Sequence, residues 1–129
     1  MDDYIITIVD DDALVRDGVQ RLVNSMSFRT EQFPSPDHLL AFEDLHLVRC
    51  IICDVHSAGQ TTENLLDRLK SLGYEIPVIF MTALPSAALR KRLLGAGAVC
   101  VLTKPFHQSE MARSLTAALE GVRAPGGSY

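Results

Sequence analysis

The sequence has no long hydrophobic run and no excess of positive charge, and both absences exclude classes of function. No apolar stretch approaches the roughly 18 residues that a membrane-spanning helix needs. No basic segment followed by an apolar one marks a secretory signal. A net charge of −4 leaves no basic footprint for nucleic acid. We therefore expect a cytoplasmic domain that neither enters a membrane nor binds DNA directly.

Cysteine is also scarce, because the 129 residues contain only three. An odd count in a chain without an export signal favours a reduced setting. Cys50 and Cys53 have the C-x-x-C spacing of some metal and redox sites, but they lie in a strand-like run. Residues three apart on a strand point to opposite faces, so these two thiols cannot hold one ion together. We interpret them, like Cys100, as buried hydrophobic side chains.

The size and composition of the chain predict one folded domain. A hydrophobic fraction of 47% beside 22% charged residues argues against disorder. The last residues, RAPGGSY, have the composition of a linker and no packing pattern. We therefore expect a domain over residues 1–121 and a flexible tail or truncated linker over residues 122–129.

Strand-like apolar runs alternate with helical patterns five times. The strand-like runs are residues 4–9, 28–33, 49–53, 77–82 and 98–103. Helical patterns follow them, with apolar stripes that include Leu14 in the first and Leu72 in the third. Ser35, followed by Pro36, and Ser86 are suited to cap helices. The alternation predicts an α/β fold, a parallel sheet with helices on both faces.

The second strand-like run differs from the other four because FRTEQF, at residues 28–33, is polar. Polar side chains are tolerated on an edge strand, so we place this run at an edge. An edge second strand fits a flavodoxin-like, doubly wound, five-stranded parallel sheet of order 2-1-3-4-5 with five helices. Ligands of such sheets bind beyond the strand carboxyl ends, where strands 1 and 3 meet.

Polar residues stand at the carboxyl ends of the four strands other than the edge strand, while those four strands are otherwise largely apolar. They are Asp10, Asp11, Asp12, Asp54, Thr82 and Lys104. Neighbouring carboxylates repel unless a cation is present, and Mg²⁺ takes one or two carboxylates together with waters and phosphate. A carboxylate beside Mg²⁺ can act as a nucleophile toward a phosphoryl group. Asp12 is the exception in this group, because it suits the cap of the first helix.

Four motifs in order resemble the receiver domain of two-component response regulators over about residues 4–121. They are Asp10-Asp11, Asp54, Thr82-Ala83 and Lys104-Pro105-Phe106. The segment GAGAVCVLTKPF is most similar to FixJ-type receivers, which usually precede a helix-turn-helix output domain.

The resemblance implies a role for each site residue. Asp54 would accept a phosphoryl group from a sensor histidine kinase. Thr82 would be the switch hydroxyl, and Lys104 would pair with the phosphorylated site and form a cis peptide bond with Pro105. Mg²⁺ or Mn²⁺ would be held by Asp10, Asp11, Asp54 and the backbone carbonyl of His56.

The implied function is a phosphorylation-controlled signalling switch. Phosphorylation would change an output or dimerisation surface on helix 4, strand 5 and helix 5, and so regulate transcription through a following domain. The domain would assist its own phosphorylation and dephosphorylation without turning over an external substrate, so it is not an enzyme in the usual sense. The His56 side chain gives a further hypothesis, that it borders the site and tunes the hydrolysis of the phosphoryl group.

The sequence departs from the family pattern in two places. Many receivers carry Met-Pro three and four residues after the phosphoacceptor and Gly eight residues after it; here Ser57, Ala58 and Thr62 occupy those positions. The aromatic residue expected three positions before the strand-5 lysine is Val101.

These departures motivate one alternative, a degenerate receiver that acts as a phosphorylation-independent protein interaction module. A phosphatase is a third interpretation. It lacks support, because the chain has no Gly-rich phosphate loop and carries His56, not a second acid, two residues after Asp54.

Overall fold

Five parallel strands form the central sheet of the computed structural model, which describes residues 4–57 and 60–121. The strands are β1 (Ile5–Val9), β2 (Arg29–Phe33), β3 (Val48–Asp54), β6 (Val78–Thr82) and β7 (Cys100–Thr103). Their spatial order is β2-β1-β3-β6-β7. This order confirms the predicted flavodoxin-like topology and the edge position of the polar strand β2.

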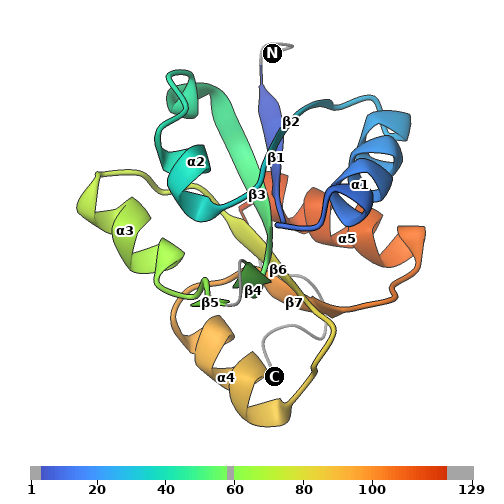
Figure 1. The fold of residues 1–129 in the computed structure, drawn as a ribbon, viewed down its shortest axis with the longest axis vertical. Coiled ribbons are helices and arrows are strands. Elements are labelled where there is room, and N and C mark those ends of the chain that lie inside the picture. Colours follow the sequence, from blue (N-terminus) through green and yellow to red (C-terminus); the bar gives the residue numbers. More distant parts are fainter. Residues whose placement is uncertain (1–3, 58–59, 122–129) are drawn as a thin grey trace.

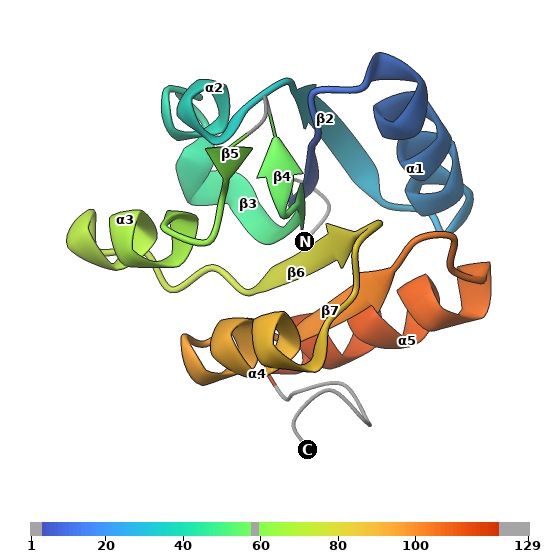
Figure 2. The same cartoon turned by 60° about the horizontal axis from the view of Figure 1, so that its bottom comes forward.

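Helices cover both faces of the sheet (Figures 1 and 2). They are α1 (Ala13–Ser25), α2 (Pro36–Leu40), α3 (Leu65–Ser71), α4 (Ala87–Gly95) and α5 (Gln108–Leu119), with a 3-10 turn, η1, at Leu45–Leu47. α1 and α5 pack on one face, and α2, α3 and α4 pack on the other. None of the helices in the described part of the chain is long and apolar enough to cross a bilayer.

The two faces of the sheet give two separate hydrophobic clusters. In the central strands β1, β3, β6 and β7, neighbouring residues such as Ile52 and Cys53 enter opposite clusters, as the two-residue period of a strand requires. Cys50 therefore packs against α1 and α5, whereas Cys53 packs on the side of α2, α3 and α4. Cys50, Cys53 and Cys100 are all buried free thiols, which confirms their interpretation as core residues.

Capping side chains begin three of the helices where the sequence predicted them. The Asp12 carboxylate accepts the N–H groups of Leu14 and Val15 at the start of α1. The hydroxyls of Ser35 and Ser86 accept an N–H in the first turns of α2 and α4. Each bond satisfies a donor that the helix itself leaves unpaired.

Two leucines assigned to helical stripes from their spacing are not in the core. Leu14 is 82% exposed, because α1 turns Val19 and Val23 toward the sheet instead. Leu72 is 57% exposed, since α3 ends at Ser71 and the chain turns away there. The helical pattern that begins at Ser35 extends in the sequence over residues 35–44, but α2 ends at Leu40. The helical spacing Met111, Leu115, Leu119, Val122 predicts an apolar stripe on the last helix, and its final member, Val122, lies outside the described residues.

Candidate functional site

The carboxyl ends of β1 and β3 lie side by side, because Val9 pairs with Cys53. The residues that follow or end these strands, Asp10 and Asp54, are therefore brought to the same rim. Both are buried, with exposed fractions of 2% and 7%. The sequence prediction that these two carboxylates converge is thus met by the register of the parallel sheet.

Lys104 joins these two carboxylates from the end of β7. Its Nζ donates to Asp54 Oδ1 at 2.8 Å and to Asp10 Oδ2 at 3.0 Å. The peptide bond from Lys104 to Pro105 is cis, as the family resemblance implied. The Lys104 backbone N–H donates to the carbonyl of Thr82 at 2.8 Å, which ties the β7 loop to the end of β6.

Burial and ion pairing have opposite effects on the pKa values of Asp10 and Lys104. Burial raises the pKa of the Asp10 carboxyl above its usual range, and this effect exceeds the lowering by hydrogen bonds from the Asp12 N–H and from Lys104. Burial by itself lowers the pKa of Lys104, but the hydrogen bonds to Asp54 and Asp10 together with the charges of these two carboxylates outweigh burial and raise it. The ammonium therefore stays charged between the carboxylates at neutral pH.

The Asp54 carboxylate is held at both oxygens. Oδ1 accepts from Lys104, and Oδ2 accepts from the backbone N–H of His56 at 3.1 Å. The side chain of His56 is exposed. A carboxylate fixed in this way approaches an incoming electrophile from one defined direction. Reactions whose rate depends on the orientation of the nucleophile are favoured by such an arrangement.

Thr82 ends β6 at the same rim and is buried. Its hydroxyl oxygen accepts the N–H of Leu84 at 3.0 Å, at the start of the loop to α4. Its neighbour in β6, Met81, pairs with Asp54 across the sheet. The rim is therefore built from the ends of β1, β3, β6 and β7.

Asp11 and Asp12 differ from Asp10, because both are exposed. Asp12 serves as the cap of α1, as the sequence indicated, and its N–H donates to Asp10 Oδ1 at 2.9 Å. Within the described residues, no group of three or more His, Cys, Asp or Glu side chains is arranged to hold a metal ion.

The chemistry of the donors at the rim nevertheless suits a hard divalent cation. Asp10 and Asp54 supply carboxylate oxygens, which Mg²⁺ prefers. Mg²⁺ is commonly bound through one or two carboxylates while it keeps several waters, so a third side chain is not required. Lys104 neutralises the same two carboxylates in this structure. A bound metal ion and the Lys104 ammonium would therefore share Asp10 and Asp54.

The loop after Asp54 contains an element that the sequence reading missed. Strands β4 (His56–Ser57) and β5 (Gln60–Thr61) pair in antiparallel orientation. Thr62 follows this pair and is 3% exposed. The sequence did indicate that this loop is unusual, because Thr62 stands where the family usually has glycine.

Val101, the other departure from the family pattern, is buried in the cluster beneath α4. Its backbone carbonyl accepts a 2.9 Å hydrogen bond from Arg90 Nη1 of α4. A cavity of about 320 Å³ lies beside it and is lined by Thr82, Pro85, Ser86, Ala87, Leu89, Arg90, Val101 and Thr103. The side chain of Arg90 thus links α4 to β7 next to the rim.

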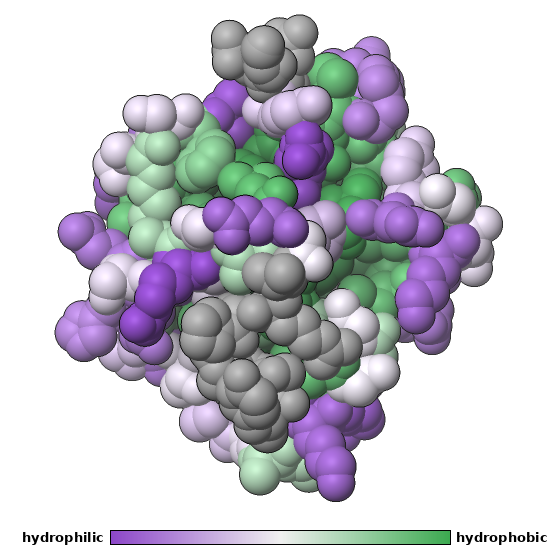
Figure 3. Space-filling model, turned by 180° about the vertical axis from the view of Figure 1, so that it is seen from behind, coloured by the Kyte–Doolittle hydropathy of each residue, from purple (hydrophilic) through white to green (hydrophobic). Residues whose placement is uncertain are grey.

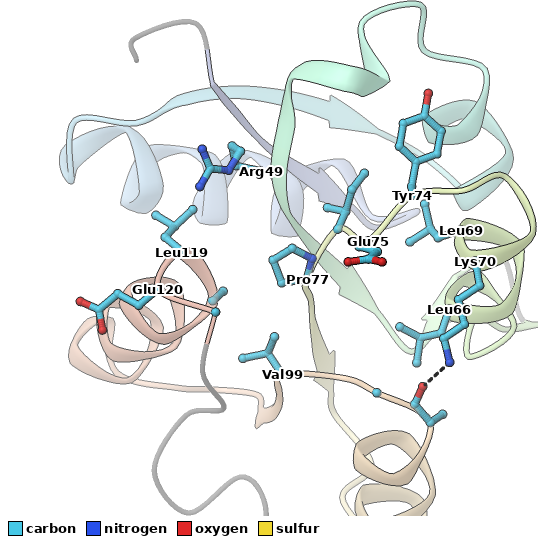
Figure 4. Close-up of a pocket in the computed structure, with 15 residues that line it drawn as sticks. Arg49, Leu66, Leu69, Lys70, Tyr74, Glu75, Pro77, Val99, Leu119 and Glu120 are labelled. Carbon is cyan, nitrogen blue, oxygen red and sulfur yellow. Dashed lines mark hydrogen bonds between the residues drawn. The ribbon is translucent and has the colours of Figure 1, made fainter.

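A separate cavity of about 670 Å³ lies at the opposite end of the sheet, near the amino ends of β3, β6 and β7. Arg49 and Lys70 lie on opposite sides of it, and Lys70 Nζ donates to the Ala96 carbonyl at 3.5 Å (Figure 4). Seen from behind, the molecule has hydrophobic residues in its hollows, and hydrophilic residues project between them and partly cover them (Figure 3). None of the predicted site residues lines this cavity.

A comparison with protein families decides what kind of domain this is. The model described as the response regulator receiver domain matches residues 6–116. The chain belongs to this receiver family. Receiver domains are signalling modules of two-component systems rather than metabolic enzymes. As a family they act as phosphorylation switches, interact with histidine kinases and bind Mg²⁺ at an acidic site.

Curated relatives of this receiver are response regulators. The response regulator protein TodT of Pseudomonas putida is 32% identical over 116 residues, which cover 90% of this chain and 51% of TodT. The transcriptional regulatory protein FixJ of Bradyrhizobium diazoefficiens is 28% identical over 114 residues, which cover 88% of this chain and 56% of FixJ. The receiver chain thus spans about half the length of these curated relatives.

Solved structures agree with the fold. The crystal structure of FixJ-N has a TM-score of 0.83 and 27% identity, covering 95% of this chain and 98% of that one. The chemotaxis protein CheY4 of Vibrio cholerae has a TM-score of 0.78 at 22% identity, covering 90% and 98% of the two chains, and supports the fold alone.

Proposed function

We propose that this receiver is a phosphorylation-controlled switch in which Asp54 is the phosphoacceptor. The arrangement of Asp54 supports the proposal: its buried carboxylate is held by Lys104 on one oxygen and by the His56 N–H on the other. Asp12, in contrast, is used by the cap of α1. Asp10 is held in the same way, by the Asp12 N–H and by Lys104, so the choice of Asp54 over Asp10 rests on its place after β3, where the receiver resemblance puts the phosphoacceptor.

In the proposed reaction, an Asp54 oxygen attacks the phosphorus atom of a phosphohistidine on a sensor kinase. The P–O bond forms as the P–N bond breaks, and the histidine nitrogen leaves with the electron pair. Lys104 lies where it can neutralise charge on the transferred group, and the Thr82 hydroxyl can donate to a phosphoryl oxygen.

A divalent cation would be held by Asp10, Asp11, Asp54 and the His56 backbone carbonyl. When bound, Mg²⁺ or Mn²⁺ would supply charge neutralisation for the phosphoryl oxygens. Asp10, buried and already accepting two hydrogen bonds, suits a contact made through water. Asp11 is exposed and lies one residue beyond Asp10, so its carboxylate is accessible from the rim.

The domain, which we place within residues 1–121, would act on partners beyond this chain. We infer a sensor histidine kinase as the phosphoryl donor. We also infer a following output domain that regulates transcription, because the relative FixJ is a transcriptional regulatory protein and is longer than this chain. The face formed by α4, β7 and α5 is the proposed surface for dimerisation or output contacts.

Phosphorylation of the intact chain by a small phosphodonor such as acetyl phosphate tests this function. The wild-type protein and an Asp12→Asn variant should take up acid-labile phosphate when Mg²⁺ is present, whereas Asp54→Asn should not. Asp12→Asn is a matched control, because it removes a neighbouring charge but keeps a side-chain oxygen for the cap. Uptake of phosphate by Asp54→Asn at the wild-type level would exclude Asp54 as the acceptor.

The alternative is a receiver that works as a constitutive interaction module. The observation that favours it is Val101, a buried valine with no aromatic ring to move between positions. Beryllofluoride, a mimic of the phosphoryl group, separates the two functions. A switch gives a saturable, Mg²⁺-dependent change in amide chemical shifts around Asp54, and a constitutive module gives none.

A further inference from the structure

Thr62 is a buried polar residue in the loop after Asp54, at the position where many receivers have glycine. Its hydroxyl donates to the Asp54 backbone carbonyl at 2.7 Å and lies 3.0 Å from the Val55 carbonyl oxygen. Its backbone N–H donates to the same Val55 carbonyl at 2.7 Å. Thr62 therefore contacts both peptide groups that directly follow the candidate phosphoacceptor.

Each of these two peptide groups is also held at its other end. The peptide between Asp54 and Val55 donates its N–H to the Met81 carbonyl at 2.8 Å, in the neighbouring strand β6. The peptide between Val55 and His56 donates its N–H to the Asp54 carboxylate at 3.1 Å. A peptide group is planar, so fixing its carbonyl also fixes the direction of its N–H.

The orientation of the Asp54 carboxylate thus depends on Thr62 through a short chain of bonds. The Thr62 N–H holds the Val55 carbonyl and the Thr62 hydroxyl holds the Asp54 carbonyl, so both peptide planes between Asp54 and His56 are fixed. The His56 N–H at the end of the second peptide then holds Asp54 Oδ2. Glycine at position 62 would keep the backbone N–H and lose the hydroxyl, and with it the 2.7 Å bond to the Asp54 carbonyl.

We propose that the Thr62 side chain is a positioning residue for the Asp54 carboxylate, in place of the conformational freedom that glycine supplies elsewhere in the family. This inference rests on the proposed function of Asp54. The Cys53 thiol, which lies 3.5 Å from the Thr62 hydroxyl, adds a further contact beneath the loop. The hydroxyl is therefore enclosed by β3 on the side away from solvent.

Three variants separate positioning from a general effect on folding. Thr62→Val keeps the size and the backbone N–H but removes the hydroxyl, whereas Thr62→Ser keeps the hydroxyl. Glu63→Gln is the matched control in the same loop, because the Glu63 carboxylate binds Arg92 of α4 at 2.8 Å and contacts neither peptide group. All three are compared with wild type in the intact chain, after urea unfolding has shown that each is folded.

The first measurement is hydrogen exchange of the His56 amide in metal-free protein, which does not depend on phosphorylation. We expect Thr62→Val to speed this exchange by about tenfold or more, because the local opening that breaks the bond to Asp54 becomes easier. Thr62→Ser and Glu63→Gln should stay within about twofold of wild type. Unchanged exchange in Thr62→Val would overturn the proposed role.

The second measurement is the rate of Asp54 phosphorylation by acetyl phosphate at saturating Mg²⁺. We expect a fall of about tenfold in Thr62→Val and recovery in Thr62→Ser, since small displacements of a nucleophile are costly. If wild type is phosphorylated on Asp54 and Thr62→Val reacts equally fast, the positioning role is wrong while the proposed function stands. If wild type takes up no phosphate, the proposed function fails. The exchange rate of the His56 amide then remains as the only test of whether the Thr62 hydroxyl orients the Asp54 carboxylate.

Discussion

Lys104 donates a 2.8 Å hydrogen bond to Asp54, although 50 residues separate them in the chain. The same ammonium reaches Asp10 at 3.0 Å. Two buried carboxylates therefore share one cation, and the charge balance of the rim depends on a single side chain. Any divalent cation that binds Asp10 and Asp54 does so beside the Lys104 charge, which opposes it.

Replacing Lys104 by Met should make the protein less stable and more dependent on Mg²⁺. The two carboxylates lose a shared hydrogen-bond donor and cation, so we expect the free energy of unfolding without metal to fall by about 1–3 kcal/mol. Mg²⁺ should then stabilise Lys104→Met more than wild type, because no ammonium competes for the carboxylates. Urea unfolding in EDTA and in saturating Mg²⁺ measures both effects. Lys70→Met is the control, and an equal gain from Mg²⁺ in Lys104→Met and wild type would contradict the prediction.

The buried Cys50 thiol should make folding sensitive to alkaline pH. Burial raises the pKa of Cys50 far above its ordinary value of 9.0. The unfolded chain therefore loses this proton at a lower pH than the folded one. The stabilisation is fully present below about pH 9 and is lost as pH rises toward the folded pKa, at a rate that approaches about 1.4 kcal/mol per pH unit.

Urea unfolding from pH 8 to pH 10 checks this sign. Cys50→Ala should lose less stability over that range than wild type, because one titrating thiol has been removed. Val19→Ala also creates space in the same cluster but keeps all three thiols, so its pH curve should run parallel to that of wild type. Parallel curves for Cys50→Ala and wild type would show that the thiol does not contribute.

Thr7→Val should stabilise the protein. Thr7 lies in the middle of β1 and is fully buried, and its hydroxyl has no hydrogen-bond partner among the described residues. Valine has nearly the same shape and removes the cost of a buried, unpaired hydroxyl, so the free energy of unfolding should rise by about 1 kcal/mol.

The control for this substitution is Thr30→Val in β2. The Thr30 hydroxyl accepts from Gln20 and donates to Asn24, both at 2.9 Å, so its removal should destabilise instead. Chemical unfolding of the two variants under identical conditions should therefore give changes of opposite sign. A loss of stability in Thr7→Val would mean that its hydroxyl has a partner.

Asp12→Ala should weaken the start of α1. The carboxylate accepts the Leu14 N–H at 2.9 Å and the Val15 N–H at 3.3 Å, so its loss should cost about 1 kcal/mol of unfolding free energy. Asp12→Ser keeps a capping oxygen and should recover most of this stability. Thermal unfolding compares the three proteins, and equal midpoints for Asp12→Ala and wild type would show that the cap is dispensable.

Most of the fold could be predicted from local patterns. The polar β2 marked an edge, the apolar runs marked the central strands, and the caps at Asp12, Ser35 and Ser86 marked helix starts. Spacing alone placed Leu14 and Leu72 in the wrong environment, because helical periodicity shows which residues share a face and not how far the neighbouring sheet extends.

The sequence by itself determined which residue types stand at the ends of the strands, and parallel strand order then required Asp10 and Asp54 to meet. Only the tertiary structure decided how they are held: Lys104 between the two carboxylates, and Thr62 against the peptide groups that follow Asp54. The physical reason is the separation along the chain of the residues that interact. Strand and helix patterns arise from neighbours in the chain, whereas a hydrogen bond forms only when donor and acceptor from distant segments meet within about 3 Å in a suitable direction.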